Sequence, residues 1–234
     1  MKRVLAILIV GLLVAAEAPA LAATADPADV KPAIEWKKIP FGAKRKRQMA
    51  AYSERHYGER TWELAAPQVV VEHYTGGTSF DAAWNYFAAN VRHLGEKPGV
   101  CAQFLIDTDG TIYQLVNLGI RCRHAIGMNW TAIGIEHVGA SAEDVLGNGK
   151  MLRASLRLSV WLMARYGISW GNVIGHAEIL RSPYHHELYE DWRCRTHGDF
   201  NRKEMRKYRR KLKRTARRLD VPIGDPPGWV DSGC

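Results

Sequence analysis

The segment at residues 69–77, VVVEHYTGG, constrains the fold of this chain most strongly. Its three consecutive β-branched residues are typical of a buried strand. His73 then lies at the C-terminal end of that strand, and the Gly-Gly pair at residues 76–77 allows the backbone to turn sharply. A histidine at the end of a rigid strand, beside a loop, is well placed to bind a metal ion. A structural histidine whose ring is satisfied by neighbours is the alternative, and this segment alone does not decide between them.

Strand and helix patterns alternate over the middle of the chain. Further strands are expected at residues 101–106, 111–116, 132–138 and 172–175, and the Asp-Gly signal at residues 107–110 predicts a hairpin between the first two. Helices are expected at residues 48–57, after a capping box at Thr78 and Asp81, at 151–166 and at 200–219. Residues 177–192 have no clear pattern and are expected to form an irregular loop. This order predicts the α/β (α+β) class: a single domain over residues 39–219, with a central mixed sheet flanked by helices.

The first 22 residues have the pattern of a secretory signal peptide. A basic start is followed by an apolar run too short to span a bilayer comfortably, and Ala20-Leu21-Ala22 is a cleavage signal. An uncleaved anchor helix is the alternative, although its run would be short and contains Glu17. Residues 23–38 then form an extended leader. The expected location is the periplasm or the extracellular space, with no transmembrane segment after cleavage.

Export changes how the cysteines are interpreted, because an oxidising compartment favours disulfides. Cys101, Cys122, Cys194 and Cys234 make an even set that allows three pairings. Cys101 with Cys122 is favoured because both lie near the predicted hairpin. Cys194 with Cys234 would then fix the Pro/Gly-rich tail at residues 220–234.

The formal net charge of +9 favours an acidic partner, such as a cell-wall polymer, an anionic lipid surface or nucleic acid. Much of this charge lies in the helix at residues 200–219. That helix is interpreted as a surface helix packed on the core by its apolar stripe, and a dedicated polymer-binding helix is the alternative. The basic cluster at residues 44–47 is interpreted as a solvated helix start, with a binding patch as the alternative.

Three histidines from separate elements are candidate metal ligands. His73 and His176 each end a strand, and His197 follows in the loop before the basic helix. Neighbouring strand ends can converge without regular spacing, and three neutral imidazoles with an open fourth position make a catalytic zinc site. Glu136 lies in an apolar strand, where the pKa of a carboxylate tends to rise, and is the candidate proton carrier. A structural ion pair is the alternative for Glu136.

Six motifs in order resemble those of the zinc-dependent N-acetylmuramoyl-L-alanine amidases, the type-2 group that includes peptidoglycan recognition proteins. They are VVVEHYT, CAQFLIDTDGTIYQLV, RHAIGMN, AIGIEHVG, VIGHAEI and RTHGDF, within residues 69–200. The resemblance implies a central mixed sheet flanked by helices, one Zn²⁺ ion, and a peptidoglycan or muropeptide substrate.

Carried over by position, the resemblance places the zinc ligands on His73, His176 and His197. The third ligand is usually Asp or Cys in this family, so Asp199 is the alternative if the loop is shifted by two residues. Glu136 falls on the catalytic carboxylate, and Arg195 on a lysine position, where it could stabilise an oxyanion but could not shuttle a proton. The expected substrate contacts are His124, Asn129 and Thr75.

The resulting hypothesis is an exported, monomeric zinc amidase that cleaves the bond between N-acetylmuramic acid and the L-alanine of the stem peptide. The first alternative is a peptidoglycan-binding module of the same fold without catalysis. Three metal-competent ligand positions favour the enzyme. The second alternative is a secreted nucleic-acid binder or nuclease, which rests on charge alone because no nucleic-acid motif accompanies it.

Overall fold

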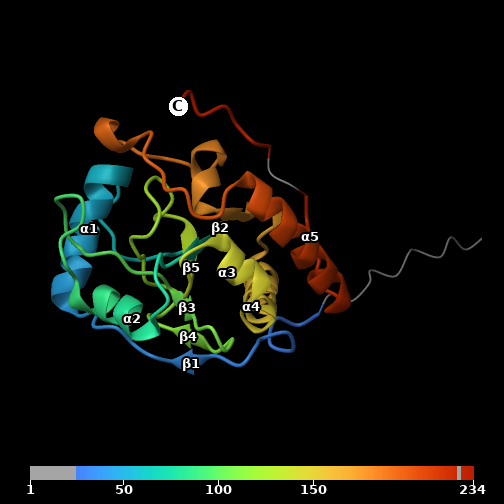
Figure 1. Cartoon of the computed structure of the whole chain (residues 1–234). Helices are drawn as coiled ribbons and strands as arrows, with labels where there is room; N and C mark the ends of the chain where they lie inside the picture. Colours follow the sequence, from blue (N-terminus) through green and yellow to red (C-terminus); the bar gives the residue numbers. More distant parts are fainter. Residues whose placement is uncertain (1–24, 226–227) are drawn as a thin grey trace, which may run out of the picture.

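A six-stranded mixed sheet forms the centre of the computed structural model, which describes residues 25–225 and 228–234 (Figure 1). The expected signal peptide lies outside the described residues. Across the sheet the order is β1-β4-β3-β5-β2-β6, and only β3 and β4 pair antiparallel. The strands are β1 (Glu35–Trp36), β2 (Val69–Tyr74), β3 (Phe104–Ile106), β4 (Ile112–Gln114), β5 (Ala132–His137) and β6 (Val173–Gly175).

Helices cover both faces of this sheet, which confirms the predicted fold class. Figure 1 shows α1 and α2 on one side and α3, α4 and α5 on the other. These helices are α1 (Ala43–Tyr57), α2 (Phe80–Ala89), α3 (Ala142–Gly147), α4 (Gly149–Tyr166) and α5 (Arg202–Arg218). Three short 3-10 helices complete the described elements: η1 (Trp170–Asn172), η2 (His176–Arg181) and η3 (Glu190–Trp192).

Strand β2 is buried on both faces because it pairs with β5 on one side and β6 on the other. Val70 packs into the cluster that includes residues of α4 and α5, whereas Val69 and Val71 pack on the opposite face. Alternation along the strand therefore sends His73 to the same face as Val69 and Val71. Glu72 points to the α4 side, where Ser159 donates a hydrogen bond to its Oε1 at 2.7 Å.

Several elements differ from the sequence prediction at their ends. Helix α2 is capped by Ser79, whose side chain accepts from the Ala82 backbone N–H, so the expected capping box at Thr78 is wrong by one residue. Helix α1 begins at Ala43, directly before the basic cluster at residues 44–47, whereas the helix was expected from residue 48. The expected irregular loop at residues 177–192 contains most of η2 and all of η3, and the expected leader contributes the edge strand β1. Short-range patterns fix element type better than element ends, because ends depend on tertiary contacts.

Both favoured disulfides are confirmed. Cys101 is bonded to Cys122, beside the β3–β4 hairpin, and Cys194 is bonded to Cys234 across 40 residues. The second bond attaches the C-terminal tail to the loop that precedes α5. Among the described residues, no helix is both long enough and apolar enough to cross a membrane.

Candidate active site

The C-terminal ends of three parallel strands meet at one edge of the sheet. His73 on β2 is in register with Glu136 on β5, and Glu72 is in register with Gly175, the last residue of β6. His176 follows Gly175 directly. Parallel pairing therefore brings His73, Glu136 and His176 to the same edge, although they are far apart in the sequence.

The loop before α5 brings a carboxylate to this edge. A Cβ atom on Gly175 would lie only 1.8 Å from the backbone oxygen of Phe200, so glycine is required for the loop to pack against the end of β6. The backbone N–H of Ala177 donates to the carbonyl of Asp199 at 3.1 Å, which fixes the loop there. Asp199 is consequently buried beside the two strand-end histidines.

His73, His176 and Asp199 form a compact group of potential metal ligands. One ligand atom from each lies within 4.8 Å of the others. The Nδ1 atoms of His73 and His176 lie 3.0 and 3.1 Å from the two carboxylate oxygens of Asp199. Although burial alone would raise the pKa of Asp199, hydrogen bonds with His176 and His73 hold it well below its usual range. Burial lowers the pKa of His73, which favours the neutral imidazole that a metal requires.

The third position differs from the sequence expectation, which placed His197 ahead of Asp199. His197 is absent from the ligand group among the described residues, and 71% of its side-chain surface is exposed. Its Nδ1 instead contacts Oδ1 of Asp199. Two imidazoles and one carboxylate nevertheless fit a catalytic zinc site, which needs three protein ligands of these types. The site thus retains a suitable donor set with the carboxylate as its third member.

The ring of His124 contacts His73 on the side of the His73 ring that faces away from Asp199. Its Nδ1 is 3.0 Å from Nε2 of His73, and its Nε2 is 3.4 Å from the carbonyl oxygen of Ala132. Gly134 makes room for this ring, because a Cβ atom there would lie 2.8 Å from Cγ of His124. The pKa of His124 falls well below its ordinary value, mainly through burial. His124 therefore contacts one of the potential metal ligands, and it also lines a cavity.

Asn129, expected to contact substrate, has a different place. Asn129 borders a cavity of about 350 Å³ beside the strand ends, but its side chain is completely buried. Its Oδ1 accepts from the backbone N–H groups of His124 and Ala125, both at 2.8 Å. Its Nδ2 donates to the hydroxyl groups of Tyr52 and Tyr57. With all its polar atoms used internally, Asn129 orients the His124 segment and offers no group to a ligand.

Glu136 is the other titratable group at this edge. Burial, and secondarily the negative charge of Asp199, raise its pKa to about 8. Its Oε2 is buried without a hydrogen-bond partner among the described residues. An unpaired buried carboxylate oxygen is costly. Glu136 forms no ion pair with any described residue, so the alternative of a structural ion pair is not observed.

A cavity of about 490 Å³ opens over these residues. His73, His124, Glu136, His176 and Asp199 all line it. Thr75 also lines it, with its hydroxyl donating to the backbone carbonyl of Gly77 at 2.8 Å.

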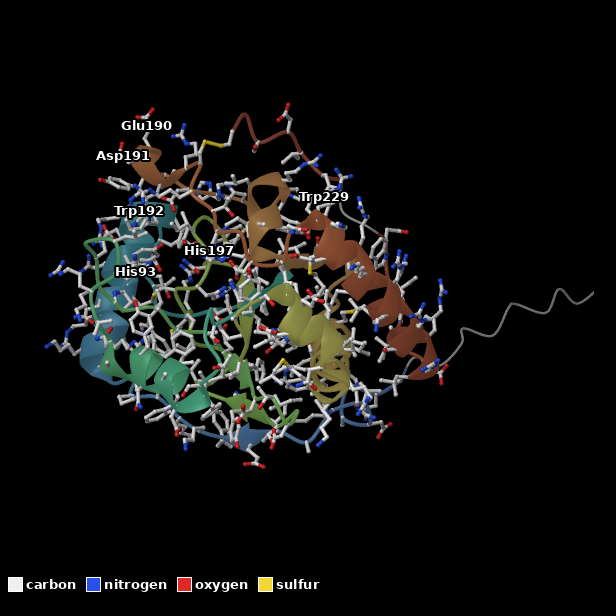
Figure 2. All side chains as sticks on the ribbon, in the orientation of Figure 1. His93, Glu190, Asp191, Trp192, His197 and Trp229 are labelled. Carbon is white, nitrogen blue, oxygen red and sulfur yellow. A yellow bond between two sulfur atoms is a disulfide. The ribbon has the colours of Figure 1, made fainter. Side chains whose placement is uncertain are left out.

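Two side chains that sequence reasoning missed line the same cavity, His93 and Arg123. Figure 2 labels His93 and His197, which come from distant segments. His93 lies in a stretch without periodicity. Arg123 directly precedes His124 in the same motif, and only His124 was expected to contact substrate. No local signal in the sequence marks either residue.

An adjoining cavity of about 350 Å³ shares His93, Arg123, His124, His176 and His197 with the first. Arg195 borders this second cavity and is not among the residues that line the first. Its Nε donates to the backbone carbonyl of Asp191 at 3.3 Å, and its side chain is exposed. The structure therefore does not bring Arg195 together with Glu136.

Comparison with known proteins supports an assignment to a family. The family model described as N-acetylmuramoyl-L-alanine amidase matches residues 63–220. No match was found among curated proteins.

Three solved structures illustrate the similarity. The endolysin N-acetylmuramoyl-L-alanine amidase LysCS from Clostridium intestinale URNW is 22% identical, with a TM-score of 0.44, over 63% of this chain and 84% of that one. A mutant endolysin from Bacillus subtilis is 28% identical, with a TM-score of 0.40, over 62% and 83%. The amidase AmiD from E. coli is 25% identical, with a TM-score of 0.39, over 49% and 50%.

The matched segment spans more than half of the chain and includes every residue of the histidine and carboxylate group described above. The chain therefore belongs to the N-acetylmuramoyl-L-alanine amidase family.

Proposed function

We propose that this protein is an exported, zinc-dependent N-acetylmuramoyl-L-alanine amidase. It hydrolyses the amide bond between the lactyl group of N-acetylmuramic acid and the L-alanine of the peptidoglycan stem peptide. The observation that carries the proposal is the convergence of His73, His176 and Asp199 in one cavity with the carboxyl group of Glu136. Membership of the amidase family supports the reaction class.

His73, His176 and Asp199 would hold a single zinc ion. Zinc bound by three protein ligands polarises a carbonyl group and lowers the pKa of a water molecule to about 7. The donor set supports this role, since each residue offers one ligand atom within 4.8 Å of the others. Asp199 takes the third position in place of His197, because its carboxylate is buried between the two histidines.

Glu136 moves the proton. As a general base it removes a proton from the attacking water, and as a general acid it later protonates the leaving amine of L-alanine. Its pKa of about 8, raised mainly by burial, suits a group that must both accept and give a proton near neutral pH. A positive ion in the same cavity would lower that pKa and favour the basic form at the start of the reaction.

His124 sets the proton positions on His73. The carbonyl of Ala132 can only accept a hydrogen bond, so Nε2 of His124 carries a proton and its Nδ1 is a bare acceptor. The facing Nε2 of His73 then donates to it. With zinc bound, Nδ1 of His73 would therefore carry no proton on the side of Asp199, which is the form that binds a metal, whereas in the metal-free site the same nitrogen is hydrogen-bonded to Asp199.

The two adjoining cavities would hold the substrate on either side of the scissile bond. Thr75 lies at the rim of the larger cavity, while Arg195 borders the smaller one, where its guanidinium could meet a carboxylate of the stem peptide. His197, exposed and lining both cavities, would contact the substrate. The two disulfides support export, since such bonds persist in oxidising compartments.

The test is digestion of a purified muropeptide, with the release of a free L-alanine amine as the readout. Glu136→Gln should lower kcat by about 10² to 10⁴ while zinc content stays at the wild-type level. Chelation should abolish hydrolysis, and added zinc should restore it. Full activity after verified zinc removal would exclude the mechanism, and binding of muropeptide without any new amine would assign the protein to the non-catalytic modules of this fold.

A further inference from the structure

A basic groove lies along α5 and the C-terminal tail, and it shares no lining residue with the two active-site cavities. Its volume is about 290 Å³. Figure 2 shows one of its walls, Trp229, beside α5. The lining consists of cationic side chains between two indole rings: Arg202, Arg206, Arg209, Arg210, Lys213, Trp170 and Trp229, with Gly171.

The charges at the rim of this groove are not neutralised. Arg202, Arg206, Arg210 and Lys213 make no ion pair with a carboxylate in the described part of the chain, and no acidic residue lines the groove. The first three are spaced four residues apart, so they lie on one side of the helix. Like charges at this spacing destabilise a helix slightly. An anion bound between them would remove that repulsion.

The floor of the groove is a fixed structure. Arg209 is 7% exposed, makes two hydrogen bonds to the carboxylate of Glu178 at 2.6 and 2.8 Å, and donates to the carbonyl of Val173. Trp229 is held in place because Val230 donates a backbone hydrogen bond to Arg181 and because the tail ends in a disulfide. Arg209 and Trp229 are therefore held in place by contacts within the protein.

Both indole rings already face cations. Nζ of Lys213 lies 4.0 Å from the ring centre of Trp170, and the guanidinium of Arg209 lies 5.8 Å from that of Trp229. The rings thus act as rigid supports that hold positive groups in place. A cation lies over one face of each ring, so that face is less available for stacking on a nucleobase. The groups presented to a ligand are ammonium and guanidinium N–H donors, whose fork geometry matches phosphate.

The length of the stripe favours a chain of anions over a single one. Arg202 and Lys213 are eleven residues apart, which corresponds to roughly 16 Å along a helix. A flat membrane surface fits poorly, because the groove is concave and the apolar residues of α5 are buried in the core. Phosphates repeated along a flexible chain can follow both the length and the concavity.

We propose that this groove binds a phosphodiester-linked polyol or sugar chain, with successive phosphates between the guanidinium groups of α5. The inference does not depend on the amidase reaction. It assigns the unpaired charge of α5 to a specific ligand-binding surface instead of a solvated helix face.

The test measures binding of the purified protein to a fluorescent poly(glycerol phosphate) oligomer over a range of salt concentrations. The double variant Arg206→Gln/Arg210→Gln should bind about tenfold more weakly, and its plot of log affinity against log salt should lose about two units of slope. The matched control is Lys207→Gln/Lys211→Gln, which removes the same charge from exposed positions on another side of the same helix, outside the groove. It should bind within about twofold of the wild type.

Equal losses in the two double variants would overturn the proposal in favour of diffuse charge attraction. Tighter binding of single-stranded DNA, with the same dependence on Arg206 and Arg210, would assign the groove to nucleic acid. Hydrolysis of a small soluble muropeptide should be unchanged in both double variants, so failure of this proposal is separable from failure of the proposed reaction.

Discussion

The carboxylate of Asp199 lies within 3.1 Å of the rings of both His73 and His176, so one side chain links the ends of β2 and β6 to the loop before α5. Strand-end positions made His73, His176 and Glu136 predictable from the sequence, because parallel strands bring their ends together. The proposed preference for Asp199 over His197 was not predictable in the same way. Both lie in a loop without periodicity, whose path is set by the contact between Phe200 and Gly175.

Replacing His124 tests whether its ring determines which nitrogen of His73 carries a proton. His124→Ala should weaken zinc binding by about 10- to 100-fold, since partners behind metal ligands typically contribute that much. His124→Asn should recover part of the affinity, because its amide oxygen can accept from Nε2 of His73. Competition titration with a chromophoric chelator measures both variants, and equal affinity in wild type and His124→Ala would contradict this role.

The raised pKa of Glu136 predicts a pH dependence of stability in the metal-free protein. Its folded-state pKa of about 8 exceeds its ordinary value of 4.5, so the folded state binds more protons between these pH values. Stability is therefore highest below pH 4.5 as far as this group is concerned, and it falls as pH rises through 8. The unfolding free energy of Glu136→Gln, relative to that of the wild type, should therefore rise by on the order of 3 kcal/mol from pH 5 to pH 8.5.

Urea unfolding of chelator-treated wild type and Glu136→Gln at several pH values measures this gain. Contributions of other titrating groups appear in both proteins and largely cancel in the difference. A difference in unfolding free energy that is constant over the range would show that Glu136 is not perturbed.

Among the elements, periodicity predicted the long helices well and their ends less well. Helix α4 and its C-cap Gly167 follow the expected pattern, because one apolar face and a positive φ at glycine are local properties. The basic cluster is a helix start as expected, but it is not fully solvated, because Arg45 within it is buried. Its guanidinium donates to backbone carbonyls of Phe87, Gly99 and Val100, which no local pattern reveals.

Strand β5 leaves space for the His124 ring because residue 134 is a glycine, and a substitution at Gly134 tests this. A methyl group there would lie 2.8 Å from Cγ of His124, so Gly134→Ala should push the ring away from His73. We expect a loss of about 1–3 kcal/mol in the free energy of unfolding, as for other overpacked cores, together with weaker zinc binding.

The matched control is Gly119→Ala, since a Cβ atom at that position meets no atom within 4 Å. It should retain wild-type stability and zinc affinity. Wild-type zinc affinity in Gly134→Ala would indicate that His124 does not need its present position.

For the whole molecule, the two disulfides and the sheet order combine segments that are distant in the sequence. The pairing Cys194–Cys234 holds the tail, and with it Trp229, against the body of the protein. The signal-peptide pattern indicated an oxidising compartment, and the even cysteine set then favoured the two pairings that are observed. It did not reveal the basic groove, because that surface needs Trp170, α5 and the tail to meet in space.

Removal of the second disulfide should destabilise the protein. The double variant Cys194→Ser/Cys234→Ser should lose about 2–4 kcal/mol of unfolding free energy, the typical contribution of a bond that closes a loop of this length. Urea denaturation measures the loss, with the Cys101–Cys122 bond intact in both proteins. An unchanged midpoint would mean that the tail is held by its other contacts alone.

The central claim is that His73, His176 and Asp199, and not His197, hold the zinc ion. The most direct test is zinc content and zinc affinity of Asp199→Ala and His197→Ala, measured on the purified proteins by elemental analysis and chelator competition. Asp199→Ala should lose about a hundredfold or more in affinity, because a ligand is removed. His197→Ala should retain one zinc per chain with affinity close to wild type, whereas the reverse pattern would contradict the account.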